Sequence, residues 1–214
     1  MRSDMIDHTF LKPAGEKGAV RRICREAKRA KFASVCVNPC EVKACARILR
    51  GSGVKVCTVV GFPLGQNTTE VKVFEAREAL RAGATELDFV VNQRLLKYDP
   101  KACERELCAL AKAGRAGRRG VVLKLILECC NLTKAEIVRG CRMAKRAGFD
   151  FVKTSTGFAA GGATVGDVRL MRKTVGKTMG VKAAGGIRDR KTALAMVAAG
   201  ATRIGTSAGP ALGF

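Results

Sequence analysis

Three apolar segments in the second half of the chain decide the fold: VVLKLILE (121–128), FDFVKTSTG (149–157) and GVKAAGG (180–186). Each contains one lysine, and Lys124, Lys153 and Lys182 follow one another at intervals of 29 residues. A lysine in a buried strand is costly to hold as a cation, so its recurrence once per strand and helix indicates a shared environment. The repeat predicts lysines that converge on one pocket inside a barrel, and it indicates covalent amine chemistry.

The same alternation of apolar and amphipathic segments extends over the whole chain. The helix-like segments end in Ala-Gly, as in LRAGAT, KRAGFD and VAAGAT, and Thr133 with Glu136 predicts a capping box. The strands are continuous apolar runs, as a parallel sheet covered by helices requires. Eight strands are predicted, at 5–10, 34–38, 54–61, 86–92, 121–128, 150–155, 180–185 and 202–207.

Eight strand and helix units in 214 residues predict an α/β fold, the (β/α)8 TIM barrel, with residues 1–214 as a single domain. A doubly wound sheet is the alternative. It needs a glycine-rich turn after the first strand, and MIDHTFLKPAG contains no GxGxxG.

Composition places the chain among globular proteins, with 47% hydrophobic and 27% charged residues. No run approaches 18 uninterrupted apolar residues, so we expect no membrane span. The segment MRSDMIDHTFL carries Asp4 and Asp7 where a signal peptide needs apolar residues, which favours a cytoplasmic location.

The formal net charge of +22 is unusual for this size. A basic surface attracts phosphate without sequence preference, so a nucleic-acid-binding protein is one alternative function. The chain has 9 Phe, 1 Tyr and no Trp, and they do not interleave with the basic runs, so we do not expect specific nucleic-acid binding. The charge would also attract a phosphorylated metabolite.

Ten cysteines include no CxxC pair and are accompanied by one histidine, which does not resemble a zinc site. Most are expected to be reduced and buried. Cys36 is the exception, because SVCVNP places its thiol near the end of a strand where it can face the pocket and make an enzyme sensitive to reactive aldehydes.

Catalytic side chains of such barrels come from the C-terminal ends of the strands. His8 is the one histidine, and we expect a structural role for it; a multi-histidine metal site is excluded, and no GxSxG elbow exists for a hydrolase. A lysine nucleophile with an aspartate and a second lysine remains, since a neighbouring cation in an apolar pocket frees the lone pair. The polar candidates are Asp7, Asn38, Asp88, Asn92, Lys124, Glu128, Lys153 and Lys182.

Glycine-rich turns follow the last three predicted strands. Ala184–Gly186 follows the seventh and Gly205–Gly209 follows the eighth, while Thr156-Gly157 and Gly161-Gly162 follow the sixth. Loops after strands seven and eight are where barrels commonly bind phosphate through backbone amides. A phosphate site is therefore predicted there.

Together these segments resemble the 2-deoxyribose-5-phosphate aldolase family of class I aldolases. The matching motifs are DHTFLKP (7–13), SVCVNP (34–39), VVGFPLGQNTTEVKVFEA (59–76), ELDFVVN (86–92), LKLILE (123–128), FVKTSTGF (151–158), VKAAGGIR (181–188) and RIGTSAG (203–209).

The resemblance implies that Lys153 forms a Schiff base, that Lys182 is the second lysine that assists it, and that Asp88 moves protons with a bound water. It implies that Lys124 and Glu128 line the same pocket. Phosphate would be held at Gly157, Gly185, Gly186, Thr206 and Ser207.

The implied reaction is reversible cleavage of 2-deoxy-D-ribose 5-phosphate to D-glyceraldehyde 3-phosphate and acetaldehyde, without a metal or an organic cofactor. The resemblance also implies a homodimer or larger homo-oligomer. Two rivals stay open: another Schiff-base phosphosugar aldolase with a different donor, and a non-catalytic basic protein that binds nucleic acid.

Overall fold

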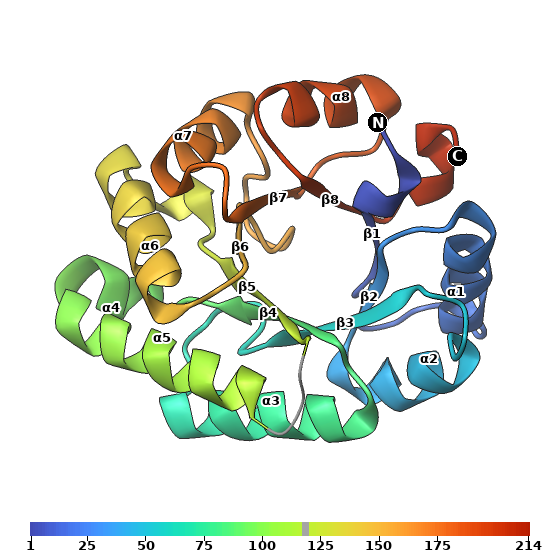
Figure 1. Ribbon diagram of the computed structural model, residues 1–214, viewed down its shortest axis with the longest axis horizontal. Helices are drawn as coiled ribbons and strands as arrows, with labels where there is room; N and C mark the ends of the chain where they lie inside the picture. Colours follow the sequence, from blue (N-terminus) through green and yellow to red (C-terminus); the bar gives the residue numbers. More distant parts are fainter. Residues whose placement is uncertain (117–119) are drawn as a thin grey trace.

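The computed structural model describes residues 1–116 and 120–214 and forms a closed barrel of eight parallel strands (Figure 1). Each strand pairs with the next one along the chain, and β1 pairs with β8 to close the ring. All eight predicted strands are confirmed, and most are a residue or two shorter than predicted. They are β1 Ile6–Phe10, β2 Ser34–Val37, β3 Lys55–Val60, β4 Glu86–Val90, β5 Val122–Ile126, β6 Phe151–Lys153, β7 Gly180–Ala184 and β8 Arg203–Thr206.

Helices surround the barrel and cover the outer face of every strand (Figure 1). The α-helices are α1 Ala19–Ala30, α2 Val42–Ile48, α3 Thr69–Ala82, α4 Gln93–Tyr98, α5 Pro100–Arg115, α6 Lys134–Ala147, α7 Val165–Val175 and α8 Arg190–Ala198. Short 3-10 helices lie at Ser3–Met5, Pro39–Glu41, Cys129–Asn131 and Gly209–Leu212.

Side chains at the helix ends explain where the helices begin and stop. Thr133 and Glu136 form the predicted capping box of α6, in which each side chain binds the backbone N–H of the other residue. Gly83 and Gly148, from the predicted Ala-Gly ends, adopt positive φ and cap α3 and α6. These caps return the chain to the next strand within a few residues.

Most of the apolar core lies between the strands and the helices. Outward-facing strand residues such as Val35, Leu87 and Leu123 are buried there against α-helical residues. A smaller apolar cluster of Leu11, Cys36, Cys57 and Val59 lies apart from it. Successive residues of a strand point to opposite faces, so the inward face is left for the polar side chains described below.

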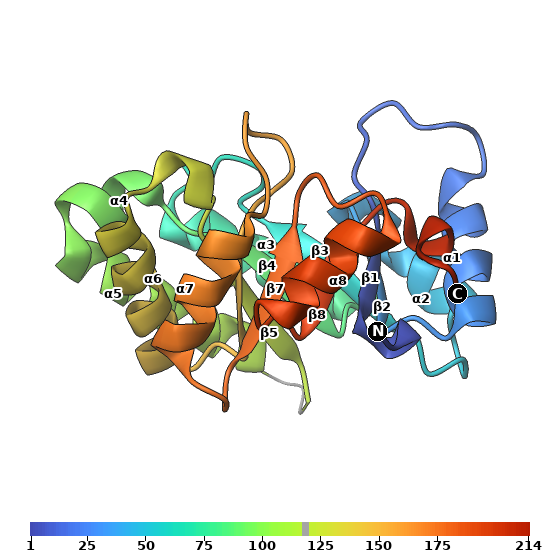
Figure 2. The ribbon, with the colours of Figure 1, turned by 90° about the horizontal axis from the view of Figure 1, so that it is seen from above.

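Loops at the C-terminal ends of the strands gather on one side of the barrel. Figure 2 shows the β1–α1 and β6–α7 connections projecting on that side. In residues 1–116 and 120–214, no helix is both long enough and apolar enough to cross a membrane.

Candidate active site

Seven charged side chains, six of them buried and one partly buried, converge inside the barrel from six strands, and we call them the barrel cluster. The most exposed of these side chains is that of Arg203, which is 14% exposed. The members of the barrel cluster are Asp7 on β1, Glu86 and Asp88 on β4, Lys124 on β5, Lys153 on β6, Lys182 on β7 and Arg203 on β8.

Asp88 is the centre of the barrel cluster. Its Oδ1 accepts a hydrogen bond from Lys124 Nζ at 2.8 Å, and its Oδ2 accepts from both Lys153 Nζ and Lys182 Nζ at 2.8 Å each. Burial disfavours its charged form, but the three ammonium groups outweigh burial and hold the pKa of Asp88 well below its usual range. Asp88 is therefore a fixed anion that joins the three lysines.

A second layer of charges, toward the N-terminal ends of the strands, supports the first. Asp7 Oδ2 lies 2.5 Å from Lys182 Nζ, and Asp7 Oδ1 lies 2.5 Å from Arg203. Glu86 Oε2 lies 2.6 Å from Lys124 Nζ and 3.2 Å from Arg203. Each cation of this layer is thus shared between carboxylates.

These carboxylates keep two of the lysines charged. Burial disfavours the ammonium form of both Lys182 and Lys124, but nearby anions outweigh it. Asp7 and Asp88 raise the pKa of Lys182, and Asp88, with smaller effects of Cys57, Glu86 and Asp7, raises the pKa of Lys124 well above its ordinary value. Lys182 is therefore a permanent cation that shares Asp88 Oδ2 with Lys153.

Two thiols complete the surroundings of Asp88. Cys57 Sγ donates to Asp88 Oδ1 at 3.2 Å and lies 3.3 Å from Lys124 Nζ. Cys36 is the register partner of Cys57, and its interaction with the Cys57 thiol lowers the pKa of the Cys36 thiol. Cys36 is fully buried in the apolar cluster with Leu11 and does not line the cavity described below, so the expectation that its thiol faces the pocket is wrong.

Potential metal ligands also meet here. Cys36, Cys57 and Asp88 form one group, and Asp7, Cys57 and Glu86 form another, with donor atoms within 4.8 Å of one another. The carboxylates of both groups already face lysine or arginine at 2.5–2.8 Å, so a divalent cation would meet cations already in place. The expectation of a metal-free site stays a prediction that this charge distribution supports.

A cavity of about 310 Å³ opens above Lys153 at the C-terminal ends of the strands. Lys153 lines it, whereas Asp88 and Lys182 lie beneath Lys153 and are fully buried. Four loops form its walls. Its lining consists of Thr9, Phe10, Leu11, Lys12, Lys153, Thr156, Gly157, Phe158, Ala184, Gly185, Gly186, Ile187, Arg188, Gly205, Thr206 and Ser207.

All five residues predicted to bind phosphate line this cavity: Gly157, Gly185, Gly186, Thr206 and Ser207. The three glycines have φ of 86°, 92° and 78°, a backbone conformation that other residues rarely adopt. Thr206 Oγ1 donates to Ile187 O at 2.7 Å and so links the loops after β7 and β8. The structure therefore brings the predicted nucleophile and the predicted phosphate loops to one cavity.

Glu128 holds the β6–α7 loop. Its carboxylate accepts hydrogen bonds from the Thr156 backbone N–H at 3.2 and 3.3 Å and from the Thr156 hydroxyl. Glu128 itself has φ of 55°, which is uncommon for a residue other than glycine. Glu128 does not line the cavity, so it acts on the site through Thr156.

Other predicted residues lie outside the cavity. Lys124 was expected in the substrate pocket, but it is fully buried because it pairs in register with Asp88, deeper in the barrel. Asn92 caps α4 by accepting from Leu95 N, and Asn38 precedes the 3-10 helix Pro39–Glu41. His8 Nε2 lies 2.6 Å from Glu26, and its ring packs on Phe32, in agreement with a structural role.

The sequence interpretation did not single out four charged residues of this region. Glu86 and Arg203 belong to the barrel cluster, while Lys12 and Arg188 line the cavity. The signal for Glu86 was its position two residues before Asp88, which places both side chains on the inward face. Lys12 and Arg188 follow β1 and β7 and could have been found by the rule that strand ends form the site.

Comparison with known proteins agrees with this geometry. The family model described as DeoC/LacD family aldolase matches residues 4–213. A deoxyribose-phosphate aldolase of Clostridium perfringens (strain SM101 / Type A) is 52% identical over 97% of this chain and 92% of its own length. One of Thermoanaerobacter sp. (strain X514) is 54% identical over 96% of this chain and 92% of its own.

Solved structures of other aldolases share the fold of this chain. The tetrameric deoxyribose phosphate aldolase of Aeropyrum pernix has a TM-score of 0.91 at 37% identity, covering 98% of this chain and 88% of its own. An aldolase designated QR15 has a TM-score of 0.91 at 41% identity, covering 98% and 93% of the two chains. The family model and the curated relatives therefore show that the chain belongs to the DeoC/LacD family of aldolases.

Proposed function

We propose that the chain is a class I aldolase that reversibly cleaves 2-deoxy-D-ribose 5-phosphate to D-glyceraldehyde 3-phosphate and acetaldehyde. One observation carries the proposal: Lys153 lines a cavity formed by the glycine-rich loops after β6, β7 and β8, and its Nζ shares Asp88 Oδ2 with Lys182. The relatives named as deoxyribose-phosphate aldolases support this substrate.

The charges of the barrel cluster fit a lysine nucleophile. Four cationic side chains face three carboxylates, Asp7, Glu86 and Asp88. With Lys153 as a neutral amine, the remaining three cations and the three carboxylates balance. A second cation beside a lysine is one of the ways in which enzymes free the lone pair for attack. Lys153 is also the lysine of the three that reaches the cavity.

In the cleavage direction, the Lys153 amine attacks the C1 aldehyde of the open-chain substrate, and loss of water gives an iminium. A base removes the C3 hydroxyl proton, the C2–C3 bond breaks, and its electron pair moves into the iminium to form an enamine. Glyceraldehyde 3-phosphate leaves, C2 is protonated, and hydrolysis of the new iminium releases acetaldehyde and restores the amine.

Asp88 and Lys182 stabilise the charge that forms during these steps and take part in the proton transfers. The Asp88 carboxylate lies within hydrogen-bond distance of Lys153 Nζ and stabilises the iminium cation. Because its pKa is held low, we assign the proton transfers to a water at Asp88 together with the Lys182 ammonium. Lys124 positions Asp88 from below, through the 2.8 Å hydrogen bond to Oδ1.

The phosphate is proposed to bind at Gly157, Gly185, Gly186, Thr206 and Ser207. Backbone amides in glycine turns and at loops seven and eight of a barrel favour an anion. Arg188 and Lys12 add positive charge to the lining.

Borohydride reduction in the presence of acetaldehyde, followed by peptide mass mapping, tests the mechanism. We expect an ethyl adduct on the peptide that carries Lys153, and none in Lys153→Ala. Lys72→Ala, which removes a buried lysine outside the barrel cluster, is the matched control and should keep the adduct. An adduct on Lys182 or Lys124 contradicts the assignment. Turnover of dihydroxyacetone in preference to acetaldehyde would favour the rival aldolase with a different donor.

The chain is also proposed to form a homo-oligomer in the cytoplasm as a single-domain protein. Leu64 in the loop before α3, and Val71 and Phe74 in its first half, are 72%, 44% and 62% exposed, and such apolar surface is typical of subunit contacts. A related aldolase of Aeropyrum pernix is a tetramer. All ten cysteines are free, as in a reducing compartment. Sedimentation at moderate salt that shows only monomer would contradict the oligomer.

A further inference from the structure

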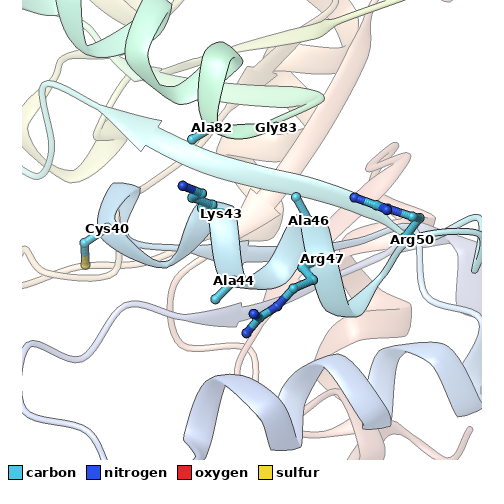
Figure 3. Close-up of a pocket in the computed structure, with 8 residues that line it drawn as sticks. All are labelled: Cys40, Lys43, Ala44, Ala46, Arg47, Arg50, Ala82 and Gly83. Carbon is cyan, nitrogen blue, oxygen red and sulfur yellow. The ribbon is translucent and has the colours of Figure 1, made fainter.

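A cavity of about 600 Å³, nearly twice the volume of the one above Lys153, lies on the outside of the barrel between α2 and the end of α3 (Figure 3). An ideal Cβ on Gly83 would lie 2.8 Å from Ala46 Cβ, so the helices approach closely at this point. The lining consists of Cys40, Lys43, Ala44, Ala46, Arg47, Arg50, Ala82 and Gly83.

Three cations of α2 and its C-terminal end dominate this lining. Lys43, Arg47 and Arg50 are spaced by four and three residues, which places them along one side of the helix, and all three are exposed. Figure 3 shows the three side chains extending from α2 and its C-terminal end, with Arg47 pointing away from Lys43 and Arg50. Within the described part of the chain, none of the three forms an ion pair or a hydrogen bond with a carboxylate, so their charge is available to a ligand.

The cavity continues toward the N-terminal end of the barrel. A second cavity of about 390 Å³ shares Ala46, Arg50 and Gly83 with the first and is also lined by Lys55. We call the two cavities the basic groove. Its four cations, Lys43, Arg47, Arg50 and Lys55, follow one another along its course, an arrangement that suits a linear polyanion better than one compact anion.

The surroundings of the basic groove are strongly positive. Residues 19–55 contain ten Lys and Arg against two acids, Glu26 and Glu41, a net +8 of the chain's +22. Glu26 is engaged by His8 at 2.6 Å and by Arg22 at 3.9 Å. Helix α1, which carries six of these cations with its C-terminal end, packs beside α2 (Figure 1). A second copy of this chain would therefore be repelled here.

We propose that the basic groove binds the sugar-phosphate backbone of single-stranded nucleic acid without base preference. A single strand is flexible enough to follow two adjoining cavities of about 600 and 390 Å³, whereas a duplex is a stiff rod. No aromatic residue lines either cavity, so bases have no stacking platform and the contacts are made to phosphates. This activity is separate from the aldolase site, which lies at the C-terminal ends of the strands.

The salt dependence gives the expected size of the effect. For a single strand, log K changes with log[salt] by about −0.7 per phosphate neutralised, so four contacts predict a slope of about −3. Removing three cations should reduce the slope by about 2 and weaken binding at 0.1 M salt by about 100-fold.

The test is fluorescence anisotropy with a labelled 15-residue oligo(dT) between 25 and 200 mM NaCl. The groove variant combines Lys43→Ala, Arg47→Ala and Arg50→Ala. The matched control combines Arg169→Ala, Lys173→Ala and Lys177→Ala, which removes three exposed cations on and just after α7, on the opposite side of the barrel (Figure 1). Borohydride trapping at Lys153 in both variants checks that the barrel is intact.

We expect the groove variant to lose about 100-fold in affinity and the control to lose only a few-fold, with both still trapped at Lys153. Equal losses in the two variants would show a diffuse charge effect and overturn the proposal, as would absence of binding by the parent protein at 50 mM NaCl. Displacement by a 15-residue polyglutamate as effective as by oligo(dT) would instead assign the groove to an acidic protein. A strong preference for dT over dA would overturn binding through the backbone alone.

Discussion

Replacement of Lys182 by methionine tests whether its positive charge controls the nucleophile. Lys153 Nζ and Lys182 Nζ each lie 2.8 Å from the same oxygen of Asp88, so the two nitrogens are at most twice that distance, 5.6 Å, apart. Two charges at that separation interact by about 3 kcal/mol at an effective dielectric constant of about 20. Since one pH unit corresponds to about 1.4 kcal/mol, this interaction energy corresponds to about two pH units.

The sign follows from the charge that is removed. Without the Lys182 cation, the ammonium form of Lys153 is no longer repelled, so the attacking amine forms at higher pH. We therefore expect the acid limb of the kcat/KM profile of Lys182→Met to move up by about two pH units. Asp7 keeps Arg203 and Asp88 keeps Lys124, so neither carboxylate is left without a cation.

The assay is retro-aldol turnover of 2-deoxy-D-ribose 5-phosphate from pH 5 to 10, with borohydride trapping over the same range. Lys72→Met is the control, because Lys72 is also fully buried and pairs with Glu106 at 3.0 Å, but between α3 and α5. Breaking that pair should cost about 3–5 kcal/mol of stability and leave the acid limb where it is. An acid limb that stays in place in Lys182→Met would refute the electrostatic role, whatever the loss of kcat.

Three further predictions concern other parts of the chain. Glu128→Ala should raise KM several-fold with a smaller change in kcat, because the Thr156 loop loses its hydrogen bonds; steady-state kinetics checks this, and Glu128→Gln should recover part of the loss. Cys36 is fully buried and lies outside the cavity, so Cys36→Ala should lose activity in excess acetaldehyde as fast as the parent, measured as residual turnover over time. Stability should fall between pH 9 and 11, because burial raises the pKa of Cys103 and Cys141 to about 12 while the unfolded thiols ionise near 8.5; urea denaturation should show this decline reduced in the double alanine variant.

The barrel could be predicted from sequence because its signals are local. Each strand is a short apolar run between glycine-capped helices, and the eight runs lie in the order in which they pair. The ends of the strands are not set by the apolar pattern alone, since Thr154 and Ser155 continue the sequence pattern of β6 but lie beyond its last paired residue, Lys153. The structure supplies closure, which arises from β1 pairing with β8 and has no signal in any one segment.

The candidate site was predicted in part for a related physical reason. Strand ends and glycine turns identified Lys153 and the phosphate loops, which lie at one cavity. Depth inside the barrel could not be inferred, because it depends on the stagger between strands. Lys124 therefore looked equivalent to Lys153 in its apolar run, yet its register places it beside Asp88, below the cavity. Ion pairs across the barrel, such as that between Arg203 and Glu86, likewise form only once the barrel has closed, so no single segment predicts them.

The two sets of cations in this protein are neutralised in different ways. Inside the barrel, Lys124, Lys153, Lys182 and Arg203 each have a carboxylate within 2.8 Å, as buried charges require. On the outer face of residues 19–55, ten cations are accompanied by two acids. The surplus that makes the chain +22 therefore lies outside the catalytic charges, and aldolase chemistry does not call for it. At the basic groove, binding of an anion accounts for this surplus of positive charge, because the cations there follow one another and have no acidic partner among the described residues. Catalysis and anion binding should then respond to different substitutions.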